Sequence, residues 1–351
     1  MSYFRENVEK AEAYKPGFQP KEANVVKLNT NENPYPPSPL VLKAIAEIKP
    51  EQLRRYPDPL ADKFRQAAAQ LYGVKPENIL CTNGGDELLS MAVRAFCDES
   101  RPVAYPVPTY SLYPVLAVLQ NCRAIEIPFN KDFSLPEKLE KTRAALTIVC
   151  NPNAPTGSFI SPQIIADLAK KLKGMLLVDE AYIDFADDNC IKLLGEFDNL
   201  IILRSLSKGY SLAGLRFGYA IADEGLISGL LKLKESYNVD VIAIAAATAA
   251  IKDQKYFKQN VERIKQNRQA LTENLRNLGF VVPESSSNFV LAQSTKKAAD
   301  FIYEKLVERN IYVRYWKQPG LENKLRISVG TAEQNNKLIC ALKEILSQSA
   351  G

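Results

Sequence analysis

A lysine, two serines and an arginine stand close together after one apolar stretch of this chain. The run 199–205 ends in Ser205, and Ser207, Lys208 and Arg216 follow it in "SLSKGYSLAGLRFGY". A lysine in a loop is usually a solvated charge. At the end of a buried strand, beside hydroxyl and guanidinium donors, its amine could instead act as a nucleophile or base next to a bound anion.

Other apolar runs in the same region also end in polar residues. "NILCT" leads into "NGGDELL", where Gly85 and Asp86 could offer a helix N-terminus to a phosphate, or Asp86 could only cap the helix. "GMLLVDEAY" ends in Asp179, with Tyr182 three residues later. Seen alone, that acid would often be a magnesium ligand or a cap. "TIVCNPNAPTG" ends in a turn that contains Asn153.

Together these residue types match the needs of pyridoxal phosphate. Its aldehyde takes a lysine, its pyridinium nitrogen needs a carboxylate, and its phosphate needs several donors. "SLSKG" is not a nucleotide-binding loop, because the glycine required before the lysine is missing. The chain contains no histidine, which removes the commonest general base and most catalytic metal sites. The sequence therefore predicts a pyridoxal-phosphate site without a metal ion.

A largely parallel sheet must position these residues. Short β-rich runs alternate with helical patterns from about residue 59 to residue 250, and such sheets bind ligands at the carboxyl ends of their strands. The predicted fold class is α/β, with a mostly parallel seven-stranded sheet flanked by helices and a second, smaller α/β domain. Strands are predicted at 78–82, 102–106, 124–128, 145–151, 174–180, 199–205 and 217–222.

A long helical pattern over 253–278, ending before Gly279, leads away from this sheet. After it, "SNFVLAQ", "NIYVRYW" and "KLRISVG" read as strands of the smaller domain, and the first thirty or so residues should lie against it. The predicted division is an N-terminal arm (1–30) that packs on the small domain, a large cofactor-binding domain (31–260) and a small domain (261–351).

Composition favours an ordinary globular protein, with 46% hydrophobic and 24% charged residues. The net charge of +5 is spread along the chain, which argues for small anionic ligands rather than nucleic acid. The six cysteines form no C-x-x-C pair and are expected to be buried free thiols in a reducing compartment. With no signal core and no apolar run long enough for a membrane span, we expect a cytoplasmic protein.

In their order along the chain, these motifs resemble those of the fold-type I pyridoxal-phosphate aminotransferases, and most closely the histidinol-phosphate aminotransferase family. The resemblance runs from about "AYKPG" to "RISVG". The matching stretches are "LNTNENPYP", "RRYPDP", "TNGGDELL", "YPVPTYSLYP", "NPNAPTG", "VDEAY", "SLSKGYSLAGLRFGY", "SSNFVL" and "LRISVG".

The resemblance implies a role for each matching residue. Lys208 would bind the cofactor covalently and, once released, act as the base. Asp179 would pair with the pyridinium nitrogen, Tyr182 with the ring hydroxyl, and Tyr110 would stack on the ring. The phosphate would be held by Gly85, Asp86, Ser205, Ser207 and Arg216.

Two matches carry further implications. The family turn usually reads "NPNNPTG", and the asparagine before "PTG" contacts the ring hydroxyl, whereas this chain has Ala154 there. Either Asn153 substitutes for it, or Tyr182 holds the hydroxyl alone. Tyr56, in "RRYPDP", matches a residue that reaches the cofactor phosphate of the other subunit, so the resemblance implies a homodimer.

The implied reaction is amino transfer from L-histidinol phosphate to 2-oxoglutarate, giving imidazole-acetol phosphate and glutamate. Arg326 would bind the glutamate carboxylate and the substrate phosphate in turn. Arg314 would be a second contact of the phosphate, unless it is only a surface charge. Tyr14 and Asn33 would close the pocket from the N-terminal segment.

Other functions stay open at this point. An aromatic-amino-acid aminotransferase or a threonine-phosphate decarboxylase would use the same cofactor residues. A cofactor-binding regulator without catalysis would need an effector domain such as a helix-turn-helix, and motifs that begin by residue 29 leave no room for one before them.

Overall fold

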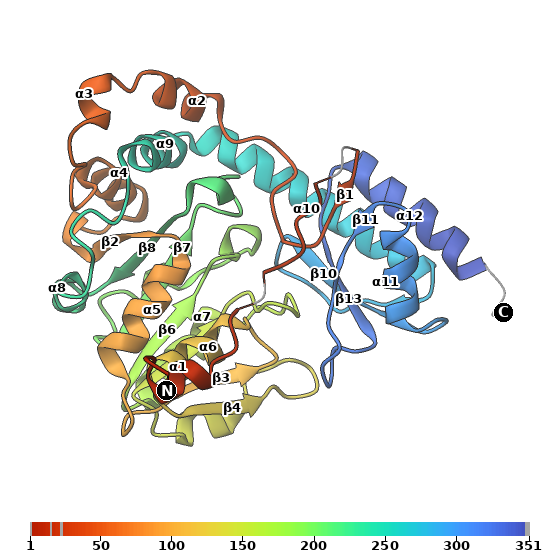
Figure 1. Ribbon diagram of the computed structural model, residues 1–351, viewed down its shortest axis with the longest axis horizontal. Helices are drawn as coiled ribbons and strands as arrows, with labels where there is room; N and C mark the ends of the chain where they lie inside the picture. The colour runs from red at the N-terminus through yellow and green to blue at the C-terminus, as the bar shows by residue number, and fades with distance from the viewer. Residues whose placement is uncertain (1, 15, 22–23, 348–351) are drawn as a thin grey trace.

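The α/β fold predicted from the sequence is confirmed by a computed structural model, which describes residues 2–14, 16–21 and 24–347 (Figure 1). Its largest sheet has seven strands in the order β2-β8-β7-β6-β5-β3-β4, and only β8 runs antiparallel to its neighbours. The strands are β2 (Ile79–Asn83), β3 (Val103–Val107), β4 (Ala124–Pro128), β5 (Leu146–Cys150), β6 (Met175–Asp179), β7 (Leu200–Ser205) and β8 (Phe217–Ala222).

Each strand lies within one residue of its predicted bounds, because a sheet covered on both faces needs continuous apolar runs. One face packs against α4 (Asp62–Tyr72), α7 (Pro162–Lys171) and α9 (Val241–Lys252). The other face packs against α5 (Gly85–Phe96), α6 (Leu112–Leu119) and α8 (Glu224–Leu231). The carboxyl ends of β2, β3, β5, β6 and β7 therefore meet at one edge of the sheet.

The long helix α10 (Gln254–Asn277) carries the chain to a second core, as predicted. Asp253 caps its start, and Gly279 follows its end with φ of +93°. The second sheet is antiparallel, in the order β12-β13-β10-β9, and packs with α11 (Ala299–Val307) and α12 (Ala332–Ser347). Its strands are β9 (Phe280–Val281), β10 (Phe289–Ser294), β12 (Arg314–Tyr315) and β13 (Lys324–Ser328).

The strand predicted at "NIYVRYW" is divided between two sheets. β11 (Ile311–Tyr312) pairs in parallel with β1 (Val26–Lys27), whereas β12 pairs with β13. The chain changes partner at Val313, and Arg314 thereby joins the edge of the sheet that carries Arg326.

The N-terminal segment contacts both cores and not the smaller one alone. The strand β1 pairs with β11 of the smaller unit. The short helix α1 (Glu6–Lys10) instead lies on α6, where Asn7 and Arg5 donate hydrogen bonds to the carbonyl of Leu119 at 3.0 and 3.2 Å. The predicted boundaries at residues 30 and 260 stay a prediction.

Two short helices, α2 (Pro39–Ala46) and α3 (Pro50–Leu53), lead from the arm to α4.

Five of the six cysteines are buried, whereas Cys340, on α12, is exposed. All six are free thiols. No helix within the described ranges is long and apolar enough to cross a membrane.

Candidate active site

A cavity of about 270 Å³ lies at the carboxyl ends of the large sheet, between that sheet and the smaller unit. It gathers the predicted site residues with the exception of Tyr56, Asn33 and Asn153. The predicted residues that line it are Tyr14, Gly85, Asp86, Tyr110, Asp179, Tyr182, Ser205, Ser207, Lys208, Arg216, Arg314 and Arg326.

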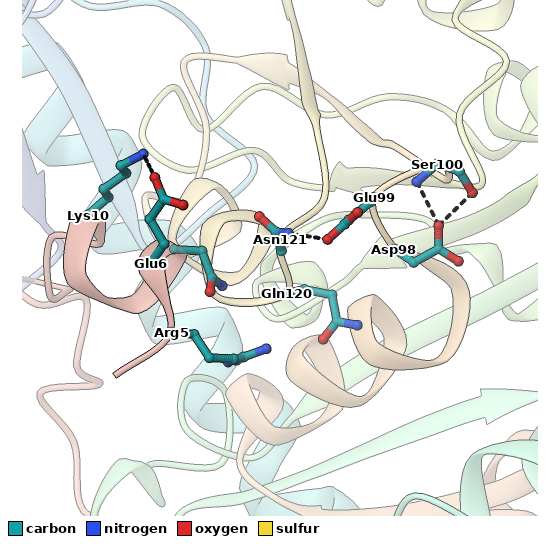
Figure 2. A pocket seen from close by; sticks show the side chains of 9 residues that line it. Arg5, Glu6, Lys10, Asp98, Glu99, Ser100, Gln120 and Asn121 are labelled. Carbon is teal, nitrogen blue, oxygen red and sulfur yellow. Dashed lines mark hydrogen bonds and ion pairs between the residues drawn. The ribbon is translucent and has the colours of Figure 1, made fainter. Parts of the chain in front are cut away.

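A larger surface hollow of about 890 Å³ lies elsewhere, between α1 and the loops that follow α5 and α6 (Figure 2). Its polar groups bond to one another or to nearby backbone carbonyls. Lys10 pairs with Glu6, and the Asn121 amide donates to Glu99 at 2.6 Å. Asp98 accepts bonds from the backbone and hydroxyl of Ser100, both at 2.8 Å. Size alone therefore does not mark the functional site, and the smaller cavity carries the reactive residues.

Lys208 follows β7 and extends into the smaller cavity. Its Nζ lies 3.4 Å from the carbonyl oxygen of Thr30 and 5.6 Å from the centre of the Tyr182 ring. Burial, and then the positive charge of Arg326, lower the pKa of Lys208 to about 8. About a tenth of the amine is therefore neutral at pH 7, far more than in a solvent-exposed lysine, and this fraction can act as a nucleophile or base.

A buried charged cluster lies directly behind the Lys208 loop. Arg204 pairs with Glu180 at 2.8 Å, and its second nitrogen lies 3.8 Å from Asp184. Burial raises the pKa of Asp184 to about 6, and a hydrogen bond from the backbone of Gly209 opposes that shift. The residue after Lys208 is thus held by the Asp184 carboxylate, which lies against Arg204.

The substitution Gly209→Ala is expected to lower the free energy of unfolding by about 1 to 3 kcal/mol and to slow turnover. A Cβ at this position would overlap the Asp184 side chain and displace the peptide next to Lys208. Denaturant unfolding and steady-state rates measure both effects. Gly214→Ala is the control, since a Cβ there meets open space. Equal unfolding midpoints for the two variants would contradict the close approach.

Asp179 ends β6 and is buried at the floor of the cavity. One carboxylate oxygen accepts a hydrogen bond from the Tyr113 hydroxyl at 2.8 Å, and the other accepts one from the Ala181 N–H at 3.1 Å. Burial raises the pKa of Asp179 to about 6, against the effect of these two donors. Sequence reasoning missed Tyr113, although it stands one helical turn after Tyr110.

The glycine turn before α5 lies at one end of the cavity. Gly84 has φ of +80°, which favours glycine, and α5 begins at Gly85. The Arg216 guanidinium lies 3.3 Å from the Asp86 carboxylate, and a Cβ at Gly84 would approach that guanidinium to 2.6 Å. The N–H of Ser207 donates to the Ser205 hydroxyl at 3.2 Å. A helix N-terminus, two hydroxyls and a guanidinium suit a phosphate.

Two arginines face the cavity from the smaller sheet. The Arg326 guanidinium donates to the carbonyl of Asn29 at 2.9 Å, while its buried Nε has no hydrogen-bond partner among the described residues. Burial lowers the pKa of Arg326 to about 10. Arg326 and Arg314 each lie 5.2 Å from the ring of Trp316, which sequence reasoning also missed. Trp316 is the single tryptophan of the chain and stands two residues after Arg314.

Tyr14 and Tyr110 close the cavity beside these arginines. Their rings meet edge to face, with centroids 5.8 Å apart, and the Tyr110 hydroxyl donates to Asp86 at 3.2 Å. Tyr182 accepts a hydrogen bond at 3.0 Å from Asn31, a further lining residue that sequence reasoning did not identify. Asn31 is buried with φ of +55° and also bonds to Ser328 of the smaller sheet, so it joins three separate segments at the cavity.

Asn33 and Asn153 lie outside the cavity for different reasons. The Asn33 amide donates to the backbone carbonyls of Lys208 and Gly209, at 3.1 and 3.3 Å, and so supports the lysine loop from behind. The Asn153 amide donates to Pro108 and Thr156, and its oxygen accepts from Thr109. These bonds occupy the Asn153 side chain inside its own turn.

Ala154, not Asn153, lines the cavity in this turn. The structure therefore does not place Asn153 where it could replace the usual asparagine. Tyr56 also lies away from the cavity, where it is 80% exposed and stacks on Tyr237 with ring centroids 4.3 Å apart.

Comparisons with known proteins agree with this geometry. A family model described as aminotransferase class I and II matches residues 23–342. A histidinol-phosphate aminotransferase of Trichormus variabilis is 46% identical over 98% of this chain and 99% of its own length, and one of a Geobacter species is 45% identical over 98% and 99%.

A solved structure is similar over nearly the whole chain. The histidinol-phosphate aminotransferase of Sinorhizobium meliloti, crystallised with pyridoxal-5'-phosphate, superposes with a TM-score of 0.89 over 99% of this chain and 98% of its own, at 27% identity. The chain therefore belongs to the class I and II aminotransferases and, within them, to the histidinol-phosphate aminotransferase family.

Proposed function

We propose that this protein transfers the amino group of L-histidinol phosphate to 2-oxoglutarate, giving imidazole-acetol phosphate and L-glutamate, with pyridoxal phosphate as cofactor. The observation that carries this proposal is the meeting of Lys208, Asp179, a glycine-rich anion site and two arginines in one cavity. Relatives with this activity in their names, at 45 and 46% identity over 98% of the chain, support it.

The cavity fits pyridoxal phosphate in the chemistry of its donors. Asp179 offers a fixed carboxylate for the ring nitrogen, and Tyr182 a hydroxyl for the ring oxygen. When bound, the cofactor withdraws electrons from the substrate carbon that carries the amino group. The residues proposed to hold its phosphate are Gly85, Asp86, Ser205, Ser207 and Arg216, with Tyr110 against the ring. Asn153 is not proposed as a cofactor contact, and Tyr182 is proposed to hydrogen-bond to the ring oxygen without it.

Lys208 is the proposed base of both half-reactions. It would hold the cofactor covalently at rest. Its freed amine would take the proton from the amino-bearing carbon of the donor in the first half-reaction, and would place a proton on the corresponding carbon of the acceptor in the second. A pKa of about 8 in the cofactor-free protein suits this exchange near neutral pH. The absence of histidine from the chain is compatible with the reaction for this reason.

Arg326 and Arg314 are proposed to hold the anionic end of each substrate. Both guanidiniums line the cavity, and together they match the higher charge of a phosphate. Tyr14 closes the pocket over the substrate. Asn33 is proposed to act indirectly, through the backbone of the lysine loop.

A spectroscopic titration tests the substrate assignment. The purified, cofactor-loaded protein is titrated with L-histidinol phosphate and, in parallel, with phenylalanine, while the visible absorption of the bound cofactor is followed. The proposal requires a change at far lower concentrations of histidinol phosphate, reversed by 2-oxoglutarate. A stronger response to phenylalanine would favour an aromatic aminotransferase, and carbon dioxide release from O-phosphothreonine would favour a decarboxylase.

We further infer a homodimer in the cytoplasm in which Tyr56 reaches the partner's cofactor phosphate. Three large apolar side chains are exposed in this region, Leu42 on α2, Leu53 on α3 and Tyr56, and a second subunit would cover them. The free cysteines suit a reducing compartment.

Mixing two impaired variants tests this sharing of sites. Tyr56→Ala and Lys208→Ala are each expected to be impaired, and a mixed dimer then contains one complete site. We expect activity to recover when the two variants are mixed, and not when either variant is treated in the same way by itself. A protein that sediments as a monomer at assay concentration would contradict the inference.

A further inference from the structure

Tyr113 joins Asp179 to the rest of the large domain. Its hydroxyl, in the first turn of α6, donates to Asp179 Oδ2 at 2.8 Å, and both side chains are buried. The other oxygen, Oδ1, accepts from the Ala181 N–H. Each carboxylate oxygen thus has one donor inside the protein and keeps lone-pair capacity for a group in the cavity.

The position of the Tyr113 hydroxyl is itself fixed by packing. The rings of Tyr105 and Tyr110 meet the Tyr113 ring edge to face, each with centroids 5.7 Å apart. Tyr105 comes from β3 and Tyr110 from the loop that follows it, so the sheet and the cavity wall both hold the ring. A donor fixed in this way orients the carboxylate that it contacts.

The electrostatic surroundings of Asp179 make this donor important. Burial raises the pKa of the carboxyl, and Asp86 and Glu180 act in the same direction. The hydrogen bonds from Tyr113 and Ala181 act against them. The other titratable neighbours are Cys150, paired with Asp179 in the sheet register, and Tyr182. The largest influences on Asp179 include no cation.

We propose that Tyr113 is a positioning residue that keeps the Asp179 carboxylate charged and aimed at the ring nitrogen of the cofactor. This inference rests on the proposed function, because it gives Asp179 that partner. The carboxylate holds a positively charged nitrogen only while it is ionised, so cofactor affinity falls as the pH falls through the pKa of Asp179. Loss of the Tyr113 hydroxyl raises that pKa and moves the loss of affinity to higher pH.

The test compares Tyr113→Phe with Tyr105→Phe, since both remove one hydroxyl from a buried tyrosine of the same cluster. The Tyr105 hydroxyl donates to Glu126 at 3.1 Å and has no bond to Asp179. The cofactor-free protein is titrated with pyridoxal phosphate between pH 5 and pH 9. The dissociation constant is measured at each pH from the tyrosine and tryptophan fluorescence. Tyr113→Phe is expected to raise the pH midpoint by about one unit, and so to weaken binding about twofold at pH 7 and about tenfold near pH 5, whereas Tyr105→Phe changes neither.

A double-mutant comparison separates this inference from the proposed function. If Tyr113 acts through Asp179, Tyr113→Phe adds no further loss in an Asp179→Asn background. An equal loss in both backgrounds, or a wild-type midpoint in Tyr113→Phe, would overturn the role of Tyr113 while leaving that of Asp179 in place. Unchanged binding by Asp179→Asn would overturn both.

A gentler change keeps the test valid if Tyr113→Phe does not fold. Fluorotyrosine at position 113 retains the ring and makes the phenol more acidic, and a more acidic phenol is a stronger donor to a carboxylate. The midpoint is then expected to move to lower pH. Movement in the opposite direction would contradict the proposed hydrogen bond.

Discussion

Lys208→Ala is expected to lower the steady-state transamination rate by at least about 10³-fold while the protein keeps its fold. The substitution removes both the proposed covalent attachment of the cofactor and the proposed base. The chain contains no histidine that could take over the proton transfer. The rate is measured with histidinol phosphate and 2-oxoglutarate, and folding is followed by circular dichroism.

Lys234→Ala is the matched control for this experiment. Burial lowers the pKa of Lys234 as well, but this lysine bonds to the backbone of Glu235 and Ser236 and does not line the cavity. It is expected to retain wild-type turnover. Appreciable steady-state activity in Lys208→Ala would refute the assignment of the lysine, and with it the proposed mechanism.

Arg326→Gln is expected to lower kcat/KM for both substrates by about 10²-fold. The buried guanidinium lines the cavity, and glutamine can replace neither its charge nor its paired donors. The loss should appear with glutamate and with histidinol phosphate alike, since both anions are proposed to use this residue. Single-turnover rates with each amino donor measure it.

Arg314→Gln distinguishes the two anions. Arg314 is only partly buried, and it is proposed as the additional contact of the phosphate. Its loss should therefore weaken histidinol phosphate more than glutamate. A selective loss of glutamate in Arg326→Gln, with histidinol phosphate unaffected, would show that the phosphate binds elsewhere.

The large sheet could be predicted from the sequence because its strands are apolar over their whole length. A strand covered on both faces leaves an unbroken apolar run, and the polar residue that ends it marks the carboxyl edge. Asp179 and Ser205 were located in this way. The strand at "NIYVRYW" was harder to predict, because its change of partner at Val313 depends on β1, which lies far away in the sequence.

The residues that sequence reasoning missed act through contacts that spacing does not encode. Tyr113 meets Asp179 only because the fold brings the first turn of α6 to the end of β6, and Asn31 meets Tyr182 across about 150 residues of chain. Asn153 lies outside the cavity for a related reason. Its amide is already used by Pro108 and Thr156, and only the folded turn shows that the side chain is occupied.

Because five of the six thiols are buried and one is exposed, the rates at which they are chemically modified would report how the structure opens. A maleimide should react quickly with Cys340 alone, on the outer helix of the smaller unit, and reach the other five only when the structure opens. Burial raises the pKa of Cys81, Cys150 and Cys190, which slows their reaction further. A dye on Cys340 would follow the smaller unit, while slow modification of Cys150 would time the opening of the cavity floor.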